Sequence, residues 1–250
     1  MVEEPSQAPA LDPRTLSQLA GGLAHELKNP LSTLGLHLAL LREQWQDEDG
    51  PKARRTVRTL DTLRTEVLRL NEILEDFLRF ARTDQIDLQT ASLNEIVERV
   101  ISFVAPEAHA RQIEVRSFLD LDLPPMRLDA GGIRQALLNL VINARQALEE
   151  KGGLITVITR RDGDHVLLEV VDDGPGMDPQ QVESCLQVYY STKKEGSGLG
   201  LPTVRRITEA HGGSLEIEST SGAGTRIGMR LPMQTAEFPT VADDSERGEG

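Results

Sequence analysis

A histidine, a carboxylate and an amide lie close together at residues 24–31 of this chain. His25 and Asn29 are four residues apart, so they share one face of a helix, with Glu26 at its flank. Pro30 has no backbone N–H for the carbonyl of Glu26, which predicts a helical kink one turn after the histidine. The segment therefore presents an imidazole beside a proton acceptor. A histidine buried on an amphipathic helix is the alternative interpretation.

A second group of chemically informative residues lies in the other half of the chain. Asn139 and Asn143 share one face of a predicted helix, and amide oxygens are neutral ligands suited to Mg²⁺, although solvated or capping asparagines are the alternative. Asp172 ends a predicted strand and precedes Gly174 and Gly176. Its carboxylate could accept from an amine such as adenine N6 while the glycines let backbone approach the ring. Taken alone, this segment is better explained as an ordinary turn.

Glycines at residues 196–200 precede a helix predicted at residues 201–211. The backbone N–H groups and the dipole at a helix N-terminus favour an anion such as phosphate. The pattern is not a Walker A loop, and Leu201 stands where a dinucleotide fingerprint needs its last glycine. A further glycine turn at residues 221–225 is uninformative as a fragment.

Composition limits the classes of function. The chain has 250 residues, enough for one large or two small domains, and its net charge of −13 argues against nucleic acid and anionic membrane surfaces. Cys185 is the single cysteine, so no internal disulfide can form, which fits a reducing compartment. The N-terminus lacks the features of a signal peptide, and the longest apolar stretch is too short to span a bilayer. We therefore expect a soluble, cytoplasmic chain without membrane insertion.

The leucine pattern of the first third predicts two long helices joined by a turn at residues 47–51. Asp12 and Pro13 resemble the N-cap and first position of the first helix, and the second helix carries a 3-4 heptad spacing between Leu60 and Phe77. Each helix would be about 50 Å long. Their apolar stripes would stay unpaired in a single hairpin, which predicts a homodimer that forms a four-helix bundle. The arginines of the second helix suit a solvated face or a docking face for an acidic partner.

The remaining pattern predicts an α+β domain of two layers with a mostly antiparallel sheet. Helices are expected at residues 93–104, opened by a capping box from Ser92 to Glu95, and at 133–148 and 201–211. Strands are expected at residues 113–119, 154–159, 166–171, 214–219 and 225–231. The expected organisation is a disordered N-terminus at 1–11, a helical hairpin at 12–84, a linker at 85–91, the α+β domain at 92–233 and a disordered acidic tail at 234–250.

The order and spacing of these segments resemble the sensor histidine kinases of two-component signalling over roughly residues 12–233. Residues 24–31 resemble the H box of the family, and the paired asparagines resemble its N box. Residues 172–176, 196–200 and 222–225 resemble its G1 box, G2 box and terminal glycine turn, while residues 211–213 and 231–232 also match. The resemblance implies a dimerisation and histidine-phosphotransfer hairpin followed by a Bergerat-type ATP-binding domain, the fold of gyrase, the Hsp90 chaperones and MutL.

The resemblance also implies a function. An ATP-dependent kinase would phosphorylate itself on His25, with Glu26 as general base, and pass the phosphoryl group to an aspartate of a response regulator. Asn29 would orient water for dephosphorylating that regulator. Asn143, helped by Asn139, would hold Mg²⁺. The implied ATP-binding residues are Asn139, Asn143, Asp172, Gly174, Gly176, Lys193, Gly196, Gly198, Leu199, Gly200 and Thr225.

Three positions depart from the family pattern. Val188 replaces the usual proline in the segment that matches the F box, Gln146 stands where many members carry a basic residue, and Gly132 stands where arginine is common. Lys193 is a candidate to supply the charge that Gln146 lacks. The alternative functions are an ATP-binding switch or scaffold without autokinase activity, and a binding module that dimerises through the hairpin. The input signal would come from a separate sensory protein, the short N-terminus or a region outside this chain.

Overall fold

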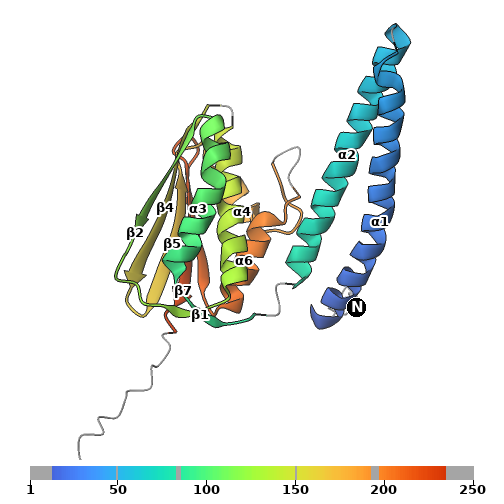
Figure 1. Ribbon diagram of the computed structural model, residues 1–250. Helices are drawn as coiled ribbons and strands as arrows, with labels where there is room; N and C mark the ends of the chain where they lie inside the picture. Colours follow the sequence, from blue (N-terminus) through green and yellow to red (C-terminus); the bar gives the residue numbers. More distant parts are fainter. Residues whose placement is uncertain (1–12, 49, 83–85, 150, 193–196, 235–250) are drawn as a thin grey trace, which may run out of the picture.

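The computed structural model describes residues 13–48, 50–82, 86–149, 151–192 and 197–234, with the side chains of 13–26 and 79–82 excepted. A helical hairpin stands beside a two-layer α+β unit, whose helices lie between its sheet and the hairpin (Figure 1). This arrangement confirms the predicted fold class. Of the ends predicted as disordered, 1–11 and 234–250, residues 1–11 and 235–250 lie outside the described residues, as does the Asp12 cap. Gln234 is described, and its carbonyl accepts from Arg127 N at 2.9 Å.

The hairpin consists of α1 (Pro13–Gln46) and α2 (Pro51–Arg82), as predicted. Ion pairs from Lys28 to Glu75 (2.8 Å) and from Arg42 to Asp61 (2.6 Å) join the two helices at two levels. Several large apolar side chains of the hairpin remain exposed: Leu27, Leu34, Leu36, Leu40, Leu41, Leu63, Leu68 and Leu70. None of the helices among the described residues combines the length and hydrophobicity that a bilayer-spanning segment needs.

The sheet of the α+β unit has the strand order β2-β4-β5-β7-β6. Only the β2–β4 pair is parallel among these strands, so the predicted mostly antiparallel sheet is confirmed. The helices α3, α4 and α6 cover one face of this sheet (Figure 1). The elements are α3 (Leu93–Ala110), β2 (Ile113–Leu119), α4 (Ala130–Leu148), β4 (Gly153–Asp162), β5 (His165–Asp172), α6 (Gly200–Ala210), β6 (Ser214–Ser219) and β7 (Thr225–Pro232).

Three short elements were not predicted. Residues 89–91, predicted as linker, instead form β1 (Gln89–Ala91), which pairs with β3 (Met126–Leu128), and a short helix α5 (Pro179–Ser184) follows β5. A three-residue strand is too short to show the alternation on which strand prediction depends. Helix α3 also continues beyond the predicted end at residue 104, because Val104 and Ala108 bury the same face on either side of Pro106.

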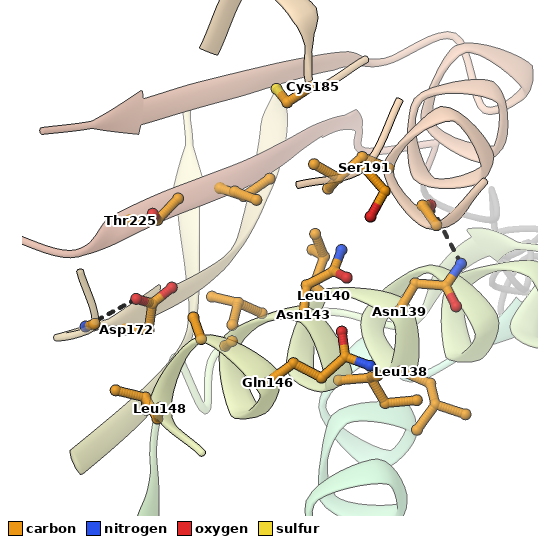
Figure 2. Close-up of a pocket in the computed structure, with 18 of the residues that line it drawn as sticks. Leu138, Asn139, Leu140, Asn143, Gln146, Leu148, Asp172, Cys185, Ser191 and Thr225 are labelled. Carbon is orange, nitrogen blue, oxygen red and sulfur yellow. Dashed lines mark hydrogen bonds between the residues drawn. The ribbon is translucent and has the colours of Figure 1, made fainter. Parts of the chain in front are cut away.

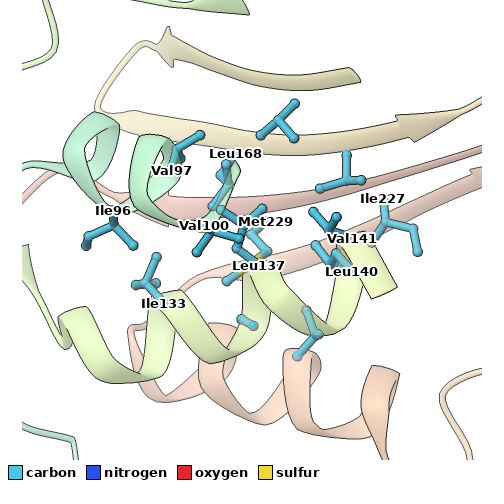
Figure 3. Packing of buried hydrophobic residues seen from close by; sticks show 14 of the residues in the cluster. Ile96, Val97, Val100, Ile133, Leu137, Leu140, Val141, Leu168, Ile227 and Met229 are labelled. Atoms are coloured by element: carbon cyan, nitrogen blue, oxygen red, sulfur yellow. The ribbon is translucent and has the colours of Figure 1, made fainter. Parts of the chain in front are cut away.

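The core lies between the helical layer and the sheet and is aliphatic, as the low aromatic content predicted. No aromatic side chain is among the buried hydrophobic residues of the described chain. Figure 3 shows Leu137 and Leu140 of α4 packed toward Leu168 of β5 and Met229 of β7. Helix α4 repeats its buried positions with helical spacing, so its other face is available for polar side chains.

Replacing a core leucine tests this packing. Leu137 is completely buried, so Leu137→Ala should lower the free energy of unfolding of the α+β unit by about 2–5 kcal/mol through lost transfer energy and the cavity left behind. Urea unfolding followed by circular dichroism measures the change. The matched control is Leu121→Ala, because Leu121 is 86% exposed and its truncation should change stability by less than about 0.5 kcal/mol. Equal effects of the two changes would contradict the described core.

Candidate functional site

The predicted pair of amides lies on α4 against the start of α6. The side chain of Asp129 caps α4 by accepting from Gly132 N at 2.9 Å. Nearly three helical turns beyond this cap, Asn139 Nδ2 donates to Gly200 O at 3.3 Å (Figure 2). A Cβ atom placed on Gly200 would lie 3.6 Å from Asn143 Nδ2. The two asparagines therefore border the N-terminus of α6.

The start of α6 is built from a glycine turn. Gly198 has φ +68°, and a Cβ atom there would lie 2.5 Å from the carbonyl carbon of Tyr189, so only glycine fits. Tyr189 N donates to Gly198 O at 3.1 Å, which holds the turn in place. Leu199 is the N-cap, and its side chain makes no capping hydrogen bond. A helix N-terminus without a side-chain cap, open to a cavity, is suited to a phosphate.

Asp172 is the last residue of β5 and is 8% exposed. Its Oδ1 accepts from Gly174 N at 3.0 Å, and a Cβ atom on Gly174 would lie 2.7 Å from the same oxygen. Gly176 has φ +65°, with Thr220 O 2.0 Å from where its Cβ would lie. Gly176 is therefore required by the backbone, whereas a side chain at Gly174 would displace the Asp172 carboxylate that the Gly174 N–H orients at the wall of the cavity.

One cavity of ≈ 1770 Å³ brings most of the predicted residues together. It exceeds the usual volume of a ligand pocket, about 300–1,000 Å³, because it extends from the β5 end to a cleft beside α2. In Figure 2, Asp172 and Thr225 lie at one side of the cavity, and the asparagines of α4 lie at another. The predicted residues that line it are Asn139, Asn143, Asp172, Gly174, Gly176, Gly198, Gly200 and Thr225.

The remaining predicted residues are placed differently. The side chain of Leu199 is 1% exposed and packs inside the unit, so this residue can offer the cavity its backbone alone. Asn29 is exposed on α1, and its carbonyl accepts from Thr33 Oγ1 at 3.1 Å. His25 belongs to α1, but its side chain lies outside the description. The side chain of Glu26 and residues Lys193 and Gly196 also lie outside the described part.

Helix α2 supplies a wall of the cavity that sequence reasoning did not identify. Arg69, Glu72, Ile73 and Asp76 all line it, and their spacing of three, four and seven residues places them on one helical face. Ser197 Oγ donates to Asp76 Oδ2 at 2.7 Å. The hairpin therefore contacts the glycine-rich segment directly. The helical spacing of Arg69, Glu72 and Asp76 was the available signal, but it does not identify the segment that these polar residues contact.

The backbone donors at the start of α6 favour an anion, whereas the charges that line the cavity balance, because Glu72, Asp76, Asp172 and Asp173 line it together with four basic residues. Its described basic lining residues are Arg69, Arg99, Arg134 and Lys151, while Gln146 lines it with a neutral amide. Within the described residues, no group of three or more His, Cys, Asp or Glu side chains could hold a metal ion. A divalent cation here would therefore depend on amide oxygens together with oxygens of an anionic ligand, which is a donor set that suits Mg²⁺.

Cys185 also lines the cavity but does not offer a nucleophile. Its Sγ donates to Val182 O at 3.1 Å, and its side chain is 7% exposed. Burial raises the pKa of the Cys185 thiol above its usual value. The neutral thiol persists at pH 7, so Cys185 contributes an apolar surface to the wall.

Two protein-family models match the chain. The model described as "His Kinase A (phospho-acceptor) domain" matches residues 15–86, which contain the hairpin except its first two residues. The model described as "Histidine kinase-, DNA gyrase B-, and HSP90-like ATPase" matches residues 128–235, which contain α4, α6 and most of the sheet.

Curated relatives give the same picture. The chain is 33% identical over 219 residues to the sensor histidine kinase ZraS of Escherichia coli O157:H7, which covers 87% of this chain and 46% of the relative. It is 31% identical over 220 residues to sporulation kinase C of Bacillus subtilis (strain 168), which covers 88% and 49%, respectively. The chain therefore spans about half the length of the curated relatives it matches.

Solved structures of histidine kinases are also similar to this chain. The crystal structure of full-length ShkA in complex with AMPPNP matches with a TM-score of 0.68 and 28% identity, over 88% of this chain and 46% of that one. The catalytic domain of the histidine kinase ThkA matches with a TM-score of 0.55 and 26% identity, over 59% of this chain and 97% of that one.

The contact between Ser197 and Asp76 can be tested directly. Asp76→Ala removes the acceptor, so amide hydrogen exchange at the first turn of α6 should become about fivefold faster, as expected for one hydrogen bond of about 1 kcal/mol. Hydrogen-exchange mass spectrometry measures this rate. Glu66→Ala is the control, because Glu66 is an exposed carboxylate on the same helix and its ion pair to Arg69 is long, at 3.8 Å. Exchange in Asp76→Ala that equals the control would contradict the contact.

Proposed function

Because this chain belongs to the sensor histidine kinases of two-component signalling, we propose that it is an ATP-dependent protein-histidine kinase that phosphorylates itself on His25. One observation carries the proposal: a single cavity gathers Asp172, the paired asparagines of α4 and the N-terminus of α6, and it opens toward α2. These groups could bind the base, the Mg²⁺ ion and the phosphates of a nucleoside triphosphate. The cavity also faces the hairpin that matches the phospho-acceptor family model.

The adenine end of ATP would lie at Asp172. Asp172 Oδ1 is already held by Gly174 N, which supports a fixed carboxylate that accepts from the exocyclic amine. The close approach of backbone at Gly176 keeps this wall free of side-chain bulk. Thr225 pairs with Asp172 across the strands and borders the same end of the cavity. ATP, not another nucleotide, is therefore the proposed phosphoryl donor.

The phosphates would lie at the start of α6. Gly198, Leu199 and Gly200 present backbone there, and the helix dipole favours negative charge. By resemblance, Lys193 and Gly196 of the same glycine-rich segment would also contribute. Mg²⁺ would be held by Asn143 with help from Asn139, with phosphate oxygens and water as its other ligands, and it would neutralise charge on the phosphates.

Phosphoryl transfer would begin at a ring nitrogen of His25. That nitrogen would attack the γ-phosphorus, the new P–N bond would replace the P–O bond to ADP, and Glu26 would accept the proton of the other ring nitrogen. A positioned base contributes about 10²–10⁴-fold to such a step. The phosphoryl group would then pass to an aspartate of a response regulator. The exposed side chain of Asn29 is accessible to such a partner, where it would orient water for dephosphorylation.

The hairpin would act as a homodimer. Exposed leucines occur on both helices, and Leu34 and Leu63 are 53% and 47% exposed. A second copy of the hairpin would bury these side chains in a four-helix bundle, which is the arrangement that the heptad spacing predicts. The proposed kinase needs ATP, which the cytoplasm supplies, and this requirement supports the predicted cytoplasmic location of this region. A separate protein, or a region outside this chain, would supply the sensory input.

An ATP-binding switch without autokinase activity is the second candidate. Gln146 lines the cavity at a position where many family members carry a basic residue, so one phosphate contact of the family is absent at this position. The two candidates make opposite predictions about phosphate incorporation. A switch binds ATP without forming a phosphoramidate, whereas a kinase forms one that is labile to acid and stable to base.

Labelling with [γ-³²P]ATP tests the proposed phosphorylation site. The wild-type chain should incorporate acid-labile, base-stable phosphate, and His25→Gln should lose it because no ring nitrogen remains to form the P–N bond. His37→Gln is the matched control, since His37 is an exposed histidine farther along the same helix. Full labelling of a folded His25→Gln chain would refute the assignment, and a wild-type chain that binds ATP without labelling would favour the switch.

Nucleotide affinity tests the role of Asp172. Asp172→Asn keeps an oxygen that can accept from Gly174 N, so the turn survives, but the negative acceptor for the adenine amine is lost. The Kd for ATP should rise about tenfold or more, as for a hydrogen bond to a charged group. Displacement of a fluorescent ATP analogue measures this change. Asp164→Asn, at an exposed position in the β4–β5 turn, should bind like the wild type, and the same Kd in both variants would disprove the role of Asp172.

A further inference from the structure

His211 is a buried histidine that the proposed mechanism does not use. It follows α6 as the C-cap and is 6% exposed. Its Nδ1 lies 2.7 Å from Ile207 O, and its Nε2 accepts from Asp129 N at 3.0 Å. A carbonyl oxygen can only accept, so Nδ1 carries the proton and Nε2 presents its lone pair. Both ring nitrogens are therefore used, and they specify one neutral tautomer.

The hydrogen bond from Asp129 joins two helices at the ends that lie away from the glycine-rich turn. Asp129 is the N-cap of α4, and its side chain accepts from Gly132 N. At the other end of α6, Asn139 Nδ2 donates to Gly200 O. The span from residue 129 to 139 on α4 and the span from 200 to 211 on α6 are both about 15 Å at helical rise. The two helices therefore run antiparallel over a similar length, and a hydrogen bond joins them at each end of this stretch.

The backbone after α6 packs closely against the sheet. Gly212 has φ +74°, and a Cβ atom on Gly213 would lie 2.3 Å from Arg230 O. Gly213 N also donates to Thr208 O at 2.9 Å. The chain therefore turns tightly from α6 into β6 against the backbone of β7. This turn places His211 beside the sheet as well as beside α4.

We infer that His211 is a positioning residue for nucleotide binding. By accepting from Asp129 N, His211 sets the position of α6 along α4. This position determines where the N-terminus of α6 lies relative to Asn139 and Asn143. Movement of α6 along α4 would separate the phosphate-binding backbone from the amides proposed to hold Mg²⁺. The inference rests on the proposed function for its consequence in ATP binding, whereas the mechanical link between the two ends of α6 is a property of the fold alone.

Three substitutions distinguish the roles of the two ring nitrogens of His211. His211→Leu keeps a similar volume but removes both polar atoms. His211→Asn keeps a donor near the position of Nδ1 but is too short to accept from Asp129 N. His211→Gln places an amide oxygen at the reach of Nε2 and should restore the acceptor. His109→Leu, at an exposed position near the end of α3, is the matched control.

Hydrogen exchange of the nucleotide-free protein is the first measurement. His211→Leu and His211→Asn should accelerate exchange about fivefold at the first turn of α6, as well as near residues 207–213, while His211→Gln should resemble the wild type. A merely local role would change exchange near residue 211 and residues 129–133 alone. If the first turn of α6 exchanges at the wild-type rate in the Leu and Asn variants, the inference is overturned. Failure of His211→Gln to restore the rate would also overturn the acceptor role.

Coupling between Mg²⁺ and ATP is the second measurement. The factor by which Mg²⁺ increases ATP affinity should fall at least about fivefold in His211→Asn, with less change in affinity measured in EDTA. An unchanged factor would overturn the inference even if the wild type phosphorylates itself. Conversely, a wild type without autophosphorylation would count against the proposed function, and the exchange experiment would still decide the role of His211. If His211→Leu fails to fold, His211→Asn alone decides both measurements.

Discussion

The start of α6 has to stay open to a ligand while the rest of that helix is held rigidly. Backbone N–H groups at a helix N-terminus have no partner within the helix, and a protein usually supplies a capping side chain. Here the cap position is occupied by Leu199, whose side chain is buried, and the turn before it depends on the left-handed conformation of Gly198. Burial of Val204 and Ile207 in the core holds the helix although its first turn has no cap. The first backbone N–H groups of α6 are thereby left available to an anion, whereas in most helices a capping side chain would accept from them.

The packing of α4 explains why the amides meet this site. Its apolar positions, from Ile133 through Leu137 and Leu140 to Ala144, face the sheet at helical spacing. Asn139 and Asn143 fall between these positions and therefore turn toward α6. The same reasoning applies to β5, where alternation directs Leu168 and Val170 into the core and leads to Asp172 at the strand end. The periodicity that builds the core therefore also delivers the polar groups to one cavity.

The sequence predicted structure wherever a pattern repeats along one helix, strand or turn. It did not predict contacts between residues that are far apart in the chain. The hairpin, the long strands and the glycine turns follow from periodicity and from residues with special φ angles, and all were predicted. The strands β1 and β3 have three residues each, too few to show a period, although they pair with each other. The contact from Ser197 to Asp76 crosses 121 positions, and that from His211 to Asp129 crosses 82. No local sequence pattern can predict such contacts, because tertiary packing alone brings these residues together.

The contact with α2 bears on how the two parts of the chain could cooperate. Glu75, next to Asp76, pairs with Lys28 of α1, so the glycine-rich segment contacts the hairpin at the level of Lys28. His25 lies three residues before Lys28, which is less than one turn of α1, or about 4.5 Å along the axis. The proposed phosphorylation site and the glycine-rich segment are therefore at nearly the same height on the hairpin, and Ser197 of that segment contacts α2. Under the proposed function, bringing a nucleotide to the histidine would therefore require movement around the hairpin more than along it.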